Sequence, residues 1–276
     1  MTDTSPSARR TGVTLLGIRY DGSSSFLRGS ADAPPLIREA LWSDAGNSWA
    51  EDGTDLGTGV VQDAGDVTPA ADEEGRAEIE AAAERVLASG RRPLVLGGDH
   101  SISFPVLRAV RRYHPRLAVL HLDAHPDLYD EFEGDRFSHA CPFARVMEAG
   151  LADRLVQVGI RTMNAHQRQQ AERLGVEVIE MRAWRDGTVL AFDTPVYLSL
   201  DLDVLEPGLA PGMSHREPGG LTVRQVLGII QSLAAPLVGA DLVEFNPAND
   251  PTGLTASVCA KLVKELAARI ISEPLW

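Results

Sequence analysis

The chain has 276 residues, of which 44% are apolar and 24% are charged, and its formal net charge at pH 7 is −13. This composition is that of a globular protein long enough to bury a substantial core. A surface with so much negative charge repels nucleic acid and anionic lipid, so neither is an expected partner. The sequence has no apolar run of the roughly 18–20 residues that a membrane-spanning helix needs, so we expect no membrane partner.

The start of the chain and its cysteines bear on domain organisation and location. Residues 1–11 contain no apolar segment, do not resemble a secretory signal, and are expected to form a disordered tail. Residues 12–276 are expected to form a single domain. The two cysteines, Cys141 and Cys259, provide no disulfide framework and suggest a reducing cytosol. The sequence therefore predicts a cytoplasmic protein.

In chain order, the first predicted element is a buried strand at residues 13–18, followed by a long polar loop and a short helix that begins at Pro34 and Pro35. Residues 43–71 are acidic and glycine-rich, and they are expected to form an irregular excursion with a short strand at 59–62. Regular alternation follows. Helices are predicted at 72–89, 102–113, 139–150, 165–174, 222–233 and 253–271, and strands at 94–96, 117–122, 155–160, 176–180, 196–203 and 237–244.

Strands that read as continuous apolar runs and alternate with helices are typical of a parallel sheet covered on both faces. The sequence therefore predicts the α/β class. In such sheets, ligands bind at the C-terminal ends of the strands. Four predicted strands lead into polar side chains at this end, at residues 99–100, 123–127, 201–203 and 244.

The strand at 117–122 runs directly into Asp123, His125 and Asp127. If the chain is still extended there, alternate side chains face the same side and these three converge on one point. The strand at 196–203 ends in the same way, with Asp201 and Asp203. Either pair of aspartates alone is equally well explained as a helix cap or a loop turn.

Placed together, these four aspartates would repel one another unless protons or cations neutralised them. Two divalent ions would resolve the repulsion. His100 follows a strand and two glycines, at the level of the other ligands, and joins the set together with His125. An oxygen-rich site with some imidazole and no thiolate suits manganese better than zinc or magnesium.

Three motifs occur in a fixed order: GGDHS at residues 97–101, DAHPD at 123–127 and SLDLD at 199–203. Together they resemble the signatures of the ureohydrolase family, which includes arginases and agmatinases. The similarity extends from about residue 13 to residue 271, and segments 127–134 and 210–220 are similar to those of plant-type arginases. The resemblance implies a three-layer α/β/α sandwich with a central, mostly eight-stranded parallel sheet.

The resemblance also implies two Mn²⁺ ions per subunit. One ion would be held by His100, Asp123, Asp127 and Asp201, and the other by His125, Asp123, Asp201 and Asp203. A metal-bridging hydroxide would then attack the guanidinium carbon of the substrate. Asp127 would also accept a hydrogen bond from that hydroxide and aim it.

Two further residues match catalytic positions of the family. Glu244 resembles the carboxylate that binds the guanidinium group, for which a planar two-point contact is suitable. His139 resembles the histidine that passes a proton to the leaving amine. A surface acid and a histidine at a helix start are the alternative explanations. His215, in a loop rich in proline and glycine, and Tyr129 are expected to contact the substrate.

The resemblance predicts hydrolysis of a small guanidino substrate. The leading hypothesis is that L-arginine is converted to L-ornithine and urea. An agmatinase or another guanidino-acid ureohydrolase is the alternative. A formiminoglutamate hydrolase and an inactive metal-binding relative are weaker alternatives. Family members commonly form trimers or hexamers, so a homo-oligomer is expected.

Overall fold

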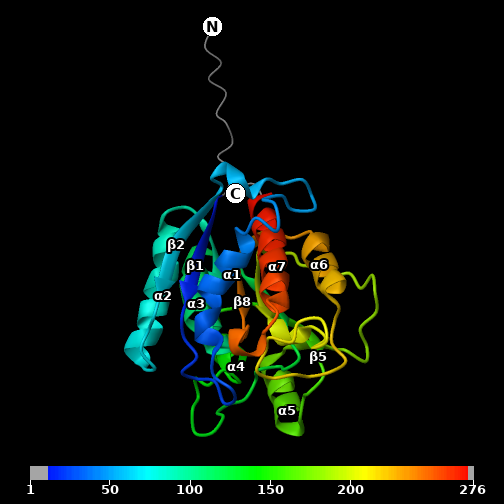
Figure 1. The fold of residues 1–276 in the computed structure, drawn as a ribbon. Coiled ribbons are helices and arrows are strands. Elements are labelled where there is room, and N and C mark those ends of the chain that lie inside the picture. Colours follow the sequence, from blue (N-terminus) through cyan, green and yellow to red (C-terminus); the bar gives the residue numbers. More distant parts are fainter. Residues whose placement is uncertain (1–11, 273–276) are drawn as a thin grey trace.

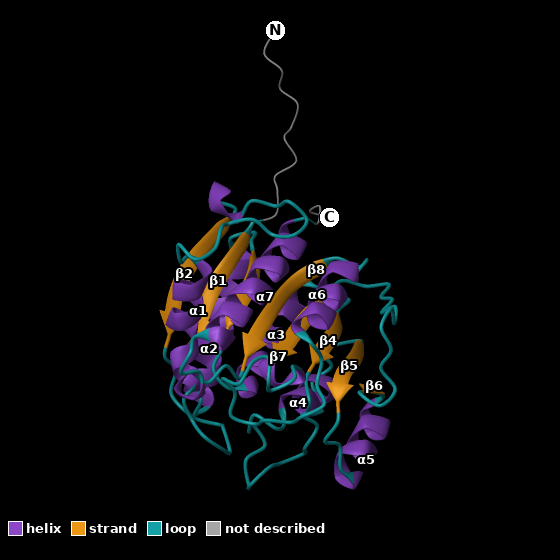
Figure 2. Cartoon of the chain, turned by 45° about the vertical axis from the view of Figure 1, so that its right-hand side comes forward, coloured by secondary structure: helices purple, strands orange, loops and turns teal. Residues whose placement is uncertain are grey.

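The computed structural model describes residues 12–272 and contains one eight-stranded sheet in which every neighbouring pair of strands is parallel. The strand order is β2-β1-β3-β8-β7-β4-β5-β6. All the strands run in one direction across the molecule (Figure 2). The strands are β1 (Val13–Ile18), β2 (Val61–Val67), β3 (Arg92–Leu96), β4 (Ala118–Leu122), β5 (Arg154–Ile160), β6 (Glu177–Glu180), β7 (Val196–Asp201) and β8 (Leu237–Val243).

Helices cover both faces of this sheet (Figure 1). They are α1 (Ala33–Leu41), α2 (Glu73–Ala88), α3 (Ser103–Tyr113), α4 (Pro142–Glu148), α5 (Ala165–Leu174), α6 (Val223–Ser232) and α7 (Leu254–Ile271). Helices α1, α6 and α7 share one buried apolar cluster with the sheet, and α2, α3, α4 and α5 share a second. The predicted three-layer α/β/α sandwich with a parallel sheet is therefore confirmed.

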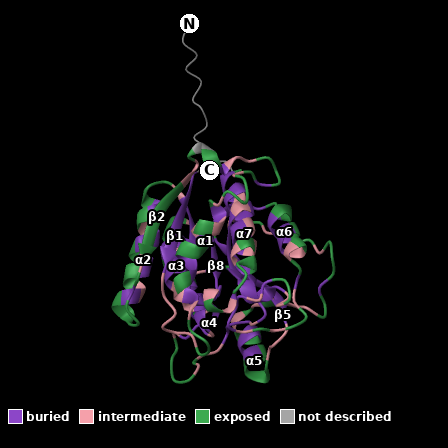
Figure 3. Cartoon of the chain, in the orientation of Figure 1, coloured by how far each residue is buried: buried purple, intermediate pink, exposed green. Residues whose placement is uncertain are grey.

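Alternation along each strand supplies both clusters. In β4, Leu120 and Leu122 pack into the first cluster while Val119 packs into the second. The central strands are buried on both sides, whereas the outer sides of the helices are exposed (Figure 3). This explains why these strands read as continuous apolar runs. Among residues 12–272, none of the helices combines the length and apolar character needed to cross a membrane.

Three predicted elements differ from the structure. The strand predicted at 196–203 ends at Asp201, and Asp203 lies in a 3-10 helix at Leu202–Val204. The short strand predicted at 59–62 is instead Val61–Val67, an edge strand with a largely exposed, acidic sequence. One neighbour and an exposed face remove the demand for apolar side chains, which is why its pattern was weak. The helix predicted at 139–150 begins only at Pro142, because residues 138–141 form a turn. This turn directs the His139 side chain to Glu244, at the end of β8.

The predicted tail at residues 1–11 lies outside the described residues, as do residues 273–276 of the predicted single domain. The assignment of 12–276 to one domain stays a prediction.

Capping residues mark the starts of two predicted helices. Asp72 accepts a hydrogen bond from Gly75 N at 2.8 Å at the start of α2, and Thr222 with Gln225 forms a capping box at the start of α6.

Candidate metal centre and active site

The C-terminal ends of four neighbouring strands, β3, β8, β7 and β4, meet in the middle of the sheet. Each carries polar side chains. His100 follows β3, Glu244 follows β8, Asp201 ends β7 and Asp123 follows β4. The tight turn after β3 requires glycine, since a side chain on Gly98 would overlap the carbonyl oxygen of Tyr20.

The first group of ligand atoms surrounds His100, which is fully buried. Its Nδ1 lies 3.1 Å from Asp123 Oδ2, 3.2 Å from Asp127 Oδ2 and 3.1 Å from Asp201 Oδ2. Within the described residues, this nitrogen has no hydrogen-bond partner despite being buried. A buried ring nitrogen that faces three carboxylates without a hydrogen bond fits a bound cation.

The opposite side of the His100 ring shows which nitrogen carries the proton. Nε2 lies 2.9 Å from Ser199 Oγ, and Ser199 donates its own hydroxyl proton to Asp241 at 2.6 Å. Asp241 also accepts hydrogen bonds from the hydroxyls of Tyr197 and Ser103, both at 2.9 Å. Ser199 Oγ can therefore only accept from His100 Nε2, and a neutral His100 presents the lone pair of Nδ1 to the three carboxylates.

The second group of ligand atoms lies beside the first and shares Asp123 with it. His125 Nδ1 is 2.8 Å from Asp203 Oδ2 and 3.4 Å from Asp123 Oδ1. The ligand atoms of His100, His121, Asp123 and Asp127 lie within 4.8 Å of one another, as do those of Asp123, His125 and Asp203, so each set could hold a metal ion. The structure thus brings together all six predicted ligands: His100, Asp123, His125, Asp127, Asp201 and Asp203.

The electrostatics of the cluster show that it needs positive charge. Burial and the neighbouring carboxylates raise the pKa of Asp203 to about 6 and that of Asp201 well above its usual range. Burial alone would lower the pKa of His100, but the surrounding aspartates outweigh it and raise that pKa well above 6.5. When no metal is bound, protons therefore bind to some of the carboxylates or to the neighbouring histidines and reduce the repulsion.

Glu244 and His139 form a buried pair beside this cluster. Nδ1 of His139 lies 3.1 Å from Glu244 Oε1, which also accepts the backbone N–H of His100 at 3.0 Å. Burial opposes ionisation of both, yet their mutual contact raises the pKa of His139 to about 9 and lowers that of Glu244. On its other side, His139 Nε2 lies 2.9 Å from Ser25 Oγ.

Backbone strain coincides with two of these carboxylates. Asp127 and Glu244 adopt left-handed conformations with φ of 48° and 64°, which non-glycine residues rarely occupy. Such strain costs on the order of 1–3 kcal/mol per residue and tends to gather at functional sites. Glu244 directly follows β8, Asp127 lies in the loop after β4, and both lie at the cluster.

A cleft of about 190 Å³ opens above the metal groups. It is lined by Ser25, His125, Asp127, Tyr129, Phe132, His139, Ala140, Thr162, Gln167, Asp201, Asp203, His215 and Glu244. Both weaker candidates, His215 and Tyr129, therefore belong to its wall. The His215 ring lies 5.2 Å from that of His139, and the Tyr129 hydroxyl accepts a hydrogen bond from Asn164 at 2.6 Å. Cys141 is buried, and burial raises the pKa of its thiol to about 12, as expected for a packing role.

Four residues of the site were missed from the sequence: His121, Gln157, Asp241 and Ser25. Only His121 had a sequence signal, because it precedes Asp123 by two residues and so shares its face of the extended chain. The other three come from β5, β8 and the loop after β1. Their contacts to the site depend on strand order and loop path, which no local pattern reports.

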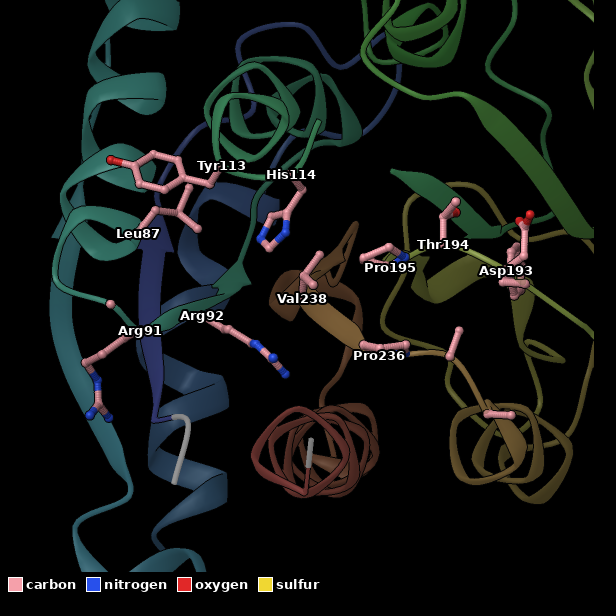
Figure 4. Close-up of a pocket in the computed structure, with 14 residues that line it drawn as sticks. Leu87, Arg91, Arg92, Tyr113, His114, Asp193, Thr194, Pro195, Pro236 and Val238 are labelled. Carbon is pink, nitrogen blue, oxygen red and sulfur yellow. The ribbon is translucent and has the colours of Figure 1, made fainter. Parts of the chain in front are cut away.

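A larger cavity of about 760 Å³ lies at the opposite edge of the sheet, around the N-terminal ends of β3, β7 and β8 (Figure 4). Its two arginines already serve the fold. Arg91 Nη2 donates to the carbonyl of Val13 at 2.7 Å, and Arg92 Nη1 donates to the carbonyls of Leu237 and Ile270 at 3.0 Å. Among the described residues, neither group that could hold a metal ion lies at this cavity.

The site is thus a cleft over two adjoining groups of side chains that could hold metal ions. The sequence profile described as "Arginase family" matches residues 11–268. The chain belongs to the arginase family, which confirms the resemblance drawn from the three motifs.

Individual relatives agree with this assignment. The chain is 47% identical to "Arginase 1, mitochondrial" of Arabidopsis thaliana, over 95% of this chain and 82% of that protein. It is 31% identical to an agmatinase of Bacillus anthracis, over 95% and 92%. The solved structure "Arginase from Medicago truncatula" superposes with a TM-score of 0.88 at 46% identity, covering 95% of this chain and 88% of that one.

The expectation of a cytoplasmic location is wrong. Similar plant arginases carry mitochondrial or chloroplastic names, which point to an organelle. The expectation rested on the small number of cysteines. That number reports the redox conditions a protein meets, and it does not identify the compartment.

Proposed function

We propose that this protein is a manganese-dependent ureohydrolase that cleaves L-arginine to L-ornithine and urea. The observation that carries the proposal is the arrangement of two metal-ligand groups, joined through Asp123, beside the buried Glu244–His139 pair. The similarity to plant arginases over nearly the whole chain supports arginine as the substrate.

In this proposal, one Mn²⁺ ion would be held by His100, Asp123, Asp127 and Asp201, and the other by His125, Asp123, Asp201 and Asp203. The donor set of carboxylate oxygens with one imidazole for each ion suits manganese. Two such ions supply the activation of water as a nucleophile at neutral pH.

The protein's own residues bind and orient the substrate. Glu244 is ionised at neutral pH and lines the cleft, so its carboxylate can bind the planar guanidinium cation. Asp127 also lines the cleft and would orient the nucleophile. His139 lies beside Glu244 in the same cleft and would pass a proton to the leaving amine.

The second candidate is an agmatinase. One observation favours it: among the residues described for the cleft wall, there is no Lys or Arg to bind the carboxylate of an amino acid. An arginine head group would depend on neutral donors such as Tyr129, Thr162 and Gln167, whereas agmatine has no carboxylate to bind.

The test is urea release from the manganese-loaded protein with L-arginine, agmatine and 4-guanidinobutyrate, and formamide release from formiminoglutamate. We expect urea from arginine at the highest kcat/KM. Urea chiefly from agmatine would transfer the assignment to the second candidate, and no urea from any guanidine would refute both. We further propose that the protein is a trimer or hexamer, which sedimentation velocity would test.

A further inference from the structure

His121 contacts the carboxylate that joins the two metal-ligand groups. It lies on β4, is fully buried, and stacks on Phe143 with the ring centroids 3.9 Å apart. Its Nε2 is 2.7 Å from Asp123 Oδ2. The other oxygen of Asp123 accepts the backbone N–H of His125 at 2.5 Å. Both oxygens of Asp123 are thus held by the protein as well as facing the metal groups.

Gln157 determines which ring nitrogen of His121 carries the proton. It is the cross-strand partner of His121 on β5 and is fully buried. One atom of its side-chain amide lies 2.6 Å from the carbonyl oxygen of Pro126 and 3.0 Å from His121 Nδ1. A carbonyl oxygen only accepts hydrogen bonds, so that atom is the amide nitrogen.

The proton on His121 then has one place. An amide nitrogen only donates, so His121 Nδ1 must accept, and a neutral imidazole carries its hydrogen on Nε2. This hydrogen points to Asp123 Oδ2. Neither ring nitrogen keeps a lone pair for a metal ion, although one of them lies within 4.8 Å of the ligand atoms of His100, Asp123 and Asp127.

We propose that His121, fixed in one tautomer by Gln157, is a positioning residue of the metal centre and not a ligand. It holds the Asp123 carboxylate in the orientation in which both metal groups share it. Through the carbonyl of Pro126, Gln157 also ties the turn that carries His125 and Asp127 to β5. The inference deepens the proposed function, since it rests on metal binding at this site.

The test compares Mn²⁺ affinity and stoichiometry in the metal-free protein, measured by chelator competition without substrate. His121→Phe keeps the ring stack but removes the donor, and His121→Gln returns an amide donor near the position of Nε2. Gln157→Met removes the groups that fix the tautomer at similar side-chain length. His114→Phe, a partly buried histidine at the opposite edge of the sheet, is the matched control.

Substitution of a residue that hydrogen-bonds to a metal ligand typically lowers metal affinity by about 10- to 100-fold. We expect His121→Phe to weaken Mn²⁺ binding within this range at unchanged stoichiometry, Gln157→Met to weaken it less, and His121→Gln to recover part of the loss. His114→Phe should bind as the unaltered protein does. Loss of one ion per subunit in His121→Phe would identify a ligand and overturn the proposal, as would unchanged affinity in both His121→Phe and Gln157→Met.

The result is separable from the proposed activity. If the unaltered protein binds Mn²⁺ but releases no urea, the ureohydrolase assignment fails and the affinity comparison still decides the role of His121. If the unaltered protein binds no divalent ion, both proposals fail.

Discussion

Asp127→Asn separates the stability of the protein from its metal binding. The substitution removes one negative charge and keeps a side chain that tolerates the left-handed backbone at this position, where φ is 48°. The expected result is a metal-free protein of nearly unchanged stability that has lost most of its response to Mn²⁺ and all measurable turnover.

The structure sets the size of the effect. The oxygens of Asp123, Asp127 and Asp201 each lie 3.1–3.2 Å from His100 Nδ1, so any two of them are at most about 6 Å apart. At an effective dielectric constant of about 20, each like-charge pair then costs roughly 3 kcal/mol, and the attraction of Asp127 to a protonated His100 contributes roughly 5 kcal/mol. Because Asp201 is protonated in the metal-free protein, only the repulsion from Asp123 opposes the attraction to His100, so the free energy of unfolding should fall by no more than about 2 kcal/mol.

With metal the balance differs, because one ion loses a charged ligand. A 100-fold weaker affinity lowers the stabilisation by saturating Mn²⁺ by about 2.7 kcal/mol. Urea denaturation with and without Mn²⁺, together with metal analysis of the dialysed protein, measures both quantities. Near-normal turnover, or a manganese stabilisation equal to that of the unaltered protein, would refute the placement of Asp127 in the metal centre.

Four further predictions concern the site and the turn beside it. His139→Asn should lower turnover and leave bound manganese unchanged by metal analysis, and metal loss would mean that His139 is structural. In the metal-free protein, the raised pKa of His139 contributes up to about 3 kcal/mol of stability that is fully present below pH 6.5 and lost as the pH rises through about 9. Unfolding at pH 6 and 9.5 should show this loss only when His139 is present. Glu244→Gln should lower kcat/KM by about 10- to 100-fold by removing a charged hydrogen-bond acceptor, and unchanged steady-state kinetics would argue against guanidinium binding there. Gly98→Ala should lower the stability in thermal unfolding by about 1–3 kcal/mol or more, because the new side chain meets the backbone of Tyr20. The control Gly46→Ala places its side chain in open space and should change the stability by no more than about 0.5 kcal/mol. Equal effects of the two substitutions would contradict the close approach of Gly98 to Tyr20.

The sequence by itself predicted the candidate ligands and determined the class of fold. The spacing of Asp123, His125 and Asp127 after a buried strand predicted ligands at this edge of the sheet, but alternation along an extended chain is not the reason they meet. The chain turns after Leu122, where Asp123 accepts the backbone N–H of His125, and Asp127 is left-handed. Buried strands alternating with helices predicted the parallel sheet, since each face of a strand must be covered. The edge strand β2 escaped this logic because its side chains are mostly exposed.

Only the tertiary structure decided how these parts meet. The order β3-β8-β7-β4 places four strand ends side by side, although β3 and β8 are separated in sequence by about half of the chain. The same order brings Glu244 to His139. The pairing of β4 with β5 places Gln157 against His121 and so fixes the proton that points to Asp123. Such contacts join residues that are distant in sequence and arise from packing of whole elements, so no local spacing encodes them.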